Sequence, residues 1–186
     1  MTSPSDYKTT DPLITIDDIK GLPASEFPKM VLTNGYTSVF GFLISLTTKD
    51  FWNHFMWLIS PFEVATQWWY FCRKPIDDFR HHSVKVFDNP NWTDIEKKAM
   101  LQFIETELKK GKWATHYDVW GLIKKAFGQG SPNDKDFCSE KIDILGLIDE
   151  GCREWLTTNC SPSPEEVNSW LKSQDRFRVY GRVQPG

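Results

Sequence analysis

The sequence lacks most of the features that would place the protein in a membrane, in an oxidising compartment or on nucleic acid. It has no apolar run of about 18 residues, and residues 1–11 are polar, without the apolar region of a signal peptide. Its four cysteines form no Cys-x-x-Cys pair, and the net charge of -3 gives no basic signal for nucleic acid. We therefore expect a reduced, cytoplasmic protein with no transmembrane segment, no disulfide framework and no nucleic-acid partner.

The composition is that of a globular protein. The 186 residues are 40% hydrophobic and 25% charged, which suits a single domain with one core. We expect a flexible tail over residues 1–12 and one domain over residues 13–186. The nine tryptophans fit a large aromatic core, or alternatively a groove for a ligand with apolar or sugar-like faces.

Predicted strands fill the first half of the domain and predicted helices the second. Short irregular pieces are expected over residues 13–28. The strands are expected at 37–46, 51–59, 63–71 and 83–87, where β-branched and aromatic residues gather between turn residues.

The helices are expected at 93–110, 117–127, 138–151 and from Ser163 onward, with a last strand at 176–180. Thr93 and Ser163 each precede a glutamate by three residues, which has the form of a capping box. Strands followed by helices, rather than alternating with them, indicate an α+β fold in which a small antiparallel sheet packs against helices.

Cys138 stands where a polar loop becomes an amphipathic helix. A thiol at a helix N-terminus feels the positive end of the helix dipole, which favours the thiolate. The backbone N–H groups there can also donate to an oxyanion. A small buried residue at the start of a helix is the alternative interpretation.

His54 lies in the aromatic strand predicted at 51–59 and could act as the base for Cys138. Otherwise it is a histidine packed in the sheet. A third group should hold the imidazole in one tautomer, and Gln67 on the next strand is the preferred candidate. Glu63 and Thr66 remain open; by the alternation of a strand, Gln67 shares a face with Glu63 and not with Thr66.

Other polar residues are candidates for supporting roles. Tyr117, at the start of a predicted helix, could donate to a developing oxyanion, or could be a core tyrosine. His116 is a rival base. His81 and His82 are adjacent in a strand-like region and point to opposite faces, so they give only a weak metal signal. We expect no metal and no organic cofactor.

The order of these parts resembles the circularly permuted NlpC/P60 (papain-like) hydrolases over residues 35–182. The resemblance rests on a histidine in an early strand, Tyr117-Asp118 opening a helix, Phe137-Cys-Ser-Glu140, and the C-terminal run from Ser161. It implies a papain-like fold with Cys138 as nucleophile, His54 as base, Gln67 as the orienting residue and Tyr117 at the oxyanion. The chain departs from the family pattern around the histidine. Asn53 precedes it, and Phe55-Met56 follow where the family has Val-Gly.

The family cleaves amide or ester bonds, often in cell-wall peptides, and relatives on the same fold move acyl chains between lipids. We therefore expect a cysteine hydrolase that cleaves an amide bond in a peptide or peptidoglycan-like substrate through a thioester intermediate. The alternatives are a lipid acyltransferase or thioesterase with an acyl substrate, and a catalytically inactive binding module that grips a partner with its tryptophans.

Overall fold

The computed structural model describes residues 11–34, 51–68, 70–111, 141–159 and 162–185. Six strands form one antiparallel sheet in the order β4-β3-β2-β1-β5-β6. They are β1 (Lys29–Asn34), β2 (His54–Leu58), β3 (Glu63–Gln67), β4 (Phe71–Pro75), β5 (Ser83–Asp88) and β6 (Arg178–Val183). The prediction of an α+β fold with an antiparallel sheet is confirmed.

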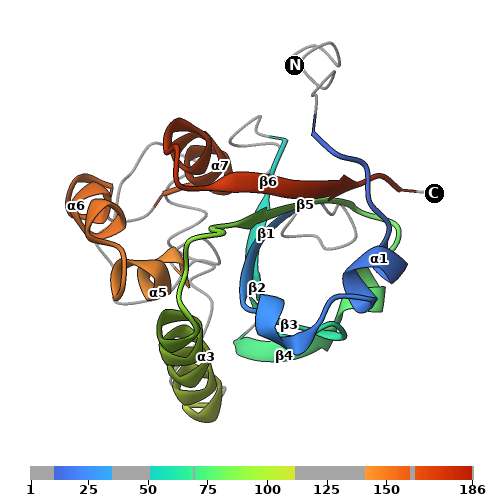
Figure 1. The fold of residues 1–186 in the computed structure, drawn as a ribbon, viewed down its shortest axis with the longest axis horizontal. Coiled ribbons are helices and arrows are strands. Elements are labelled where there is room, and N and C mark those ends of the chain that lie inside the picture. The colour runs from blue at the N-terminus through green and yellow to red at the C-terminus, as the bar shows by residue number, and fades with distance from the viewer. Residues whose placement is uncertain (1–10, 35–50, 69, 112–140, 160–161, 186) are drawn as a thin grey trace.

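Helices cover both faces of this sheet. They are α1 (Ile16–Lys20), α3 (Asp94–Lys109), α5 (Asp143–Gly146), α6 (Glu150–Thr158) and α7 (Pro164–Ser173), with short 3-10 helices at Ala24–Glu26 and Ile76–Phe79. In Figure 1 the sheet curves around α1, while α3, α5 and α6 lie on its other side. None of the described helices has the length and apolar character needed to cross a membrane.

The alternation of side chains along each strand divides the core into two parts. On β2, Phe55 and Trp57 join the core beneath α3, α5, α6 and α7, which we call the helical face. Met56 and Leu58 join the core that contains Ile16 and Ile19 of α1, which we call the α1 face. All four β2 side chains are fully buried. Because neighbouring residues of a strand point to opposite faces, a shift of one residue in β2 would exchange the two sets.

The two capping boxes form as predicted. The hydroxyls of Thr93 and Ser163 accept from the N–H groups of Glu96 and Glu166, and each glutamate accepts from the backbone N–H of its cap residue. These bonds satisfy donors that the first turn of a helix leaves unpaired. Gly111 follows α3 with a φ of +72°, a left-handed conformation that glycine adopts at little cost.

Several predicted boundaries were wrong. The strand predicted at 63–71 ends at Gln67, and Phe71 already belongs to β4. The chain turns back at Trp68, whose N–H donates to Tyr70 O at 3.1 Å. The helix expected to end at Gly151 is interrupted instead, and Asp149 caps a new helix, α6, that contains this glycine. The last strand begins at Arg178, two residues later than expected.

Two elements of the structure were not predicted, and two predicted elements cannot be compared with the structure. No strand was predicted at 29–34, which is β1 at the centre of the sheet, and no helix was predicted at α1. The expected elements at 37–46 and 117–127 lie outside the described residues.

A buried ion network fastens β1, β5 and β6 together. The Asp88 carboxylate accepts from Lys29 Nζ at 3.1 Å and from Arg178 Nε at 2.8 Å. The side chains of Lys29 and Asp88 are only 1% and 6% exposed. Glu26 supplies a second partner for Lys29 at 2.9 Å, and the ammonium lies 4.5 Å from the ring centroid of Tyr180. A buried charge is tolerated only when it is paired in this way.

Replacing Asp88 by Asn should lower the free energy of unfolding by about 2 kcal/mol, since the buried Lys29 ammonium and the Arg178 guanidinium lose the carboxylate that they share, while Glu26 still pairs with Lys29. Chemical denaturation measures this loss. Arg73→Gln is the matched control, because Arg73 pairs with Glu63 and Glu105 at the surface, where removing a pair costs less than about 1 kcal/mol. Equal losses in the two variants would contradict the account.

Candidate active site

His54 is the first residue of β2, where it pairs with Thr33 of β1. Its Nε2 lies 2.5 Å from the Thr66 hydroxyl oxygen on the neighbouring strand β3. The Trp68 ring meets the imidazole edge-to-face, with ring centroids 6.2 Å apart and an interplanar angle of 86°. The ring is therefore fixed by one hydrogen bond and one aromatic contact from the same neighbouring strand and the turn after it.

The register between β2 and β3 decides which residue contacts His54. Met56 pairs with Thr66, so Thr66 is the diagonal neighbour of His54 on the α1 face. Gln67 follows on the opposite face, beside Ala65 of the helical-face core. Gln67 therefore does not orient His54, contrary to the prediction. The residue of β3 that contacts the imidazole is Thr66.

Glu63, the other alternative for the orienting residue, lies at the far end of β3. It binds Arg73 at 3.0 Å on the surface and makes no contact with the imidazole.

Burial holds the His54 imidazole in its neutral form. Loss of hydration lowers the pKa of His54 to about 4, and the nearby His82 adds to the effect. When the proton resides on Nε2, the ring donates to the Thr66 hydroxyl and Nδ1 is left as an acceptor. Within the described ranges, the bond between Nε2 and the Thr66 hydroxyl is the one hydrogen bond of this ring. At neutral pH the His54 ring is therefore uncharged.

The segment that follows Cys138 is attached to the same strand as His54. The indole N–H of Trp57 donates to Lys141 O at 2.8 Å, and both residues are buried. Lys141 comes three residues after Cys138, and Trp57 comes three residues after His54. Cys138, Tyr117 and His116 themselves lie outside the described residues, as does Glu140 of the resemblance.

The two cysteines in the described part of the chain have environments that suppress the thiolate. Burial raises the pKa of Cys152 to about 12, with a further contribution from the Asp149 carboxylate. Burial also raises the pKa of Cys72, which is partly exposed on β4. A thiol that stays protonated is a poor nucleophile, so neither residue is suited to that role.

The adjacent histidines His81 and His82 do not complete a metal site. Among the described residues, no three side chains of the histidine, cysteine, aspartate or glutamate type come together as metal ligands. His82 packs against Phe79, with ring centroids 5.8 Å apart, and burial lowers its pKa.

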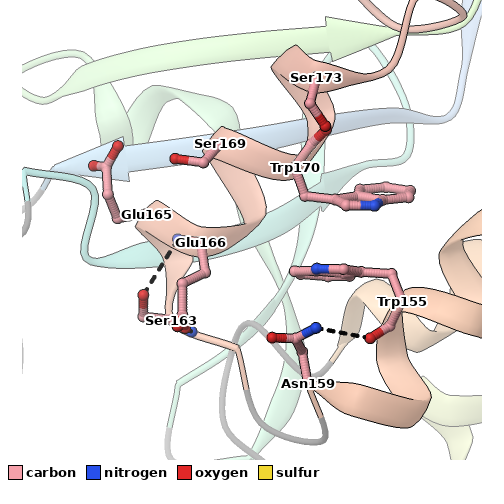
Figure 2. A pocket seen from close by; sticks show the side chains of 8 residues that line it. All are labelled: Trp155, Asn159, Ser163, Glu165, Glu166, Ser169, Trp170 and Ser173. Carbon is pink, nitrogen blue, oxygen red and sulfur yellow. Dashed lines mark hydrogen bonds between the residues drawn. The ribbon is translucent and has the colours of Figure 1, made fainter.

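A groove between α6 and α7 was not predicted from the sequence (Figure 2). It has a volume of about 500 Å³ and is lined by Trp155 and Trp170 together with the carboxylates of Glu165 and Glu166. The two indoles stack, with centroids 5.0 Å apart and an interplanar angle of 18°. The only sequence signal was the general count of tryptophans. Those next to His54 in sequence, Trp52 and Trp57, are buried core residues instead.

Neither a scan against protein-family models nor a search of curated proteins finds a match to this chain.

The depressed pKa of His54 should make the protein less stable in acid. Between pH 6.5 and about 4 the unfolded chain binds a proton that the folded state excludes, so stability falls as the pH decreases through this window. We expect His54 to contribute about 2 kcal/mol of this loss. Each pKa unit corresponds to about 1.4 kcal/mol, and the full shift is discounted because His54 as a whole residue is only partly buried.

Chemical denaturation of the wild type and of His54→Gln at several pH values measures this contribution. Because His82 also titrates abnormally, the quantity to compare is the difference between the two pH slopes. Parallel curves for the two proteins would contradict a depressed His54 pKa.

Proposed function

We propose that the protein is a cysteine hydrolase in which His54 is the general base for Cys138. The observation that carries the proposal is the hydrogen bond from Trp57 to Lys141. It ties the chain just after the cysteine to the strand that begins with the histidine. A neutral imidazole whose Nε2 is held by Thr66 supplies the acceptor that thiol chemistry requires.

The side-chain directions on β2 set a condition for this reaction. The His54 ring shares the α1 face with Met56, whereas Lys141 meets Trp57 on the helical face. His54 is the first residue of its strand, so its ring lies at an end of the sheet rather than in the middle. Three residues span at most about 11 Å, and the proposal requires residues 138–140 to use that reach toward the His54 end of β2.

The proposed reaction is acyl transfer to sulfur followed by hydrolysis. His54 Nδ1 takes the thiol proton as Cys138 Sγ attacks the carbonyl carbon of an amide. The resulting imidazolium returns this proton to the departing amine as the C–N bond breaks, which leaves a thioester. Water, deprotonated by His54, then releases the acid, and the proton passes back to sulfur. In this proposal, Tyr117 and backbone N–H groups close to Cys138 stabilise the oxyanion.

The proposed substrate is an amide bond in a peptide or peptidoglycan-like molecule, on the strength of the NlpC/P60 resemblance. Acyl transfer to a lipid or another acceptor would use the same first half of the reaction. The two outcomes differ in whether water or a second substrate releases the thioester.

An activated ester tests the proposed nucleophile and base without knowledge of the natural substrate. Incubation with p-nitrophenyl acetate should acetylate Cys138, as seen by intact mass and peptide mapping, and water should then regenerate the thiol. Cys138→Ala should abolish p-nitrophenol release, and His54→Ala should reduce it at least about 100-fold, which is the usual contribution of a general base. Cys72 and Cys152 should remain unmodified because their pKa values are raised.

Full ester cleavage in the Cys138→Ala protein would overturn the proposal. An acetyl-enzyme that forms but resists water would indicate acyl transfer instead of hydrolysis.

Thr66 is proposed as the positioning residue of His54. Thr66→Val should lower the rate of ester cleavage about tenfold, since the Nε2–H group loses its acceptor while the side-chain volume is kept. Thr66→Ser keeps the hydroxyl and should restore most of the rate. A purely structural role would not be rescued in this way, because serine packs less well than valine at a fully buried site. Equal rates for the Val and Ser variants would remove Thr66 from the proposed site.

A further inference from the structure

The groove between α6 and α7 has carboxylates at one side and stacked indoles at the other (Figure 2). Its lining includes two carboxylates, Glu165 and Glu166, and no lysine or arginine. Ser169, one turn further along α7, lies on the same side (Figure 2). Charge complementarity therefore favours a cationic occupant.

The hydrogen bonds of the two carboxylates define what kind of cation fits. Glu165 accepts from Asn168 Nδ2 at 2.8 Å through Oε1 and from Trp52 N at 3.4 Å through Oε2. Glu166 accepts from Ser163 N at 2.5 Å through Oε2. At least one oxygen of each carboxylate already accepts a hydrogen bond within the protein, so neither carboxylate has both oxygens open to the paired N–H groups of a guanidinium. An ammonium group makes single, separately directed hydrogen bonds and suits these acceptors better.

The aromatic part of the groove suits the rest of a lysine side chain. Trp170 already lies 5.6 Å from an internal cation, the Arg176 guanidinium, which Asp149 binds at 2.6 Å. Trp155, stacked on Trp170, is partly exposed and lines the groove. An indole accommodates both the apolar stem of a lysine and its ammonium group.

The groove is connected to the candidate active site through Trp52. This residue donates its backbone N–H to Glu165 and precedes His54 by two residues. We propose that the groove binds the lysine side chain of a peptide. Its use as a substrate subsite rests on the proposed hydrolase function; the binding itself does not.

Titration calorimetry with two short peptides tests the inference. The probes are acetyl-Ala-Lys-Ala-amide and the matched norleucine peptide, which keeps the apolar stem and lacks the charge. They are added to the full-length Cys138→Ala protein at low ionic strength. The lysine peptide should bind about tenfold more tightly, the combined effect of two partly exposed charge pairs and one cation–π contact.

The variant that removes the charge is Glu165→Gln with Glu166→Gln. Glutamine can still complete the capping box at position 166, so α7 should remain folded, which circular dichroism verifies. This variant should lose the preference for lysine. The control is Glu150→Gln with Glu154→Gln, two exposed α6 residues outside the groove lining, which should keep it.

Equal affinities for the two peptides, no binding of either, or an undiminished preference in the Glu165/Glu166 variant would each overturn the inference. Failure of the hydrolase proposal gives a different result. Ester cleavage would then persist in the Cys138→Ala protein while the lysine preference still depended on Glu165 and Glu166.

Discussion

Trp57 joins the two parts of the molecule on which the account depends. Its ring is fully buried on the helical face of the sheet, and its indole N–H donates to the backbone of Lys141, where the described chain resumes before α5. A buried indole needs such an acceptor, because an unpaired N–H in the core is costly. The bond therefore fixes where the segment that leads into α5, α6 and α7 meets the sheet. The proposed nucleophile precedes this segment, and the acidic groove lies between its last two helices.

The same strand that holds Trp57 on one face presents His54 on the other. Because successive side chains of β2 point to opposite faces, Phe55 and Trp57 point toward the helices. His54, Met56 and Leu58 point toward α1. Burial makes the imidazole neutral, and Thr66 holds its Nε2 atom through a hydrogen bond. In the proposed reaction, a base that is neutral at neutral pH takes its proton during the attack of the thiol, and no imidazolium–thiolate pair forms beforehand.

The sequence was informative where a signal is local. The capping boxes at Thr93 and Ser163 depend on residues within one helical turn, and α3 and α7 begin where they predict. The position of His54 on a strand was likewise readable from the aromatic run around it. Strand β1 was missed because both of its faces are buried, so Met30, Val31 and Leu32 are apolar in succession and do not alternate with polar residues.

The orienting residue and the groove depended on register and on packing between elements. Whether Thr66 or Gln67 meets His54 is decided by a shift of one residue between β2 and β3, which composition does not reveal. The groove arises because α6 and α7 bring Trp155 and Trp170 together from positions fifteen residues apart in the chain. Neither residue shows in isolation that it will meet the other.

The most direct test of the account is the protonation state of the His54 ring, read from its nitrogen chemical shifts by NMR with His54→Gln used for assignment. At pH 7 we expect a neutral imidazole with the proton on Nε2 and with Nδ1 unprotonated. A charged ring at that pH, or a proton on Nδ1, would contradict the assignment of His54 as the base that Thr66 holds in place.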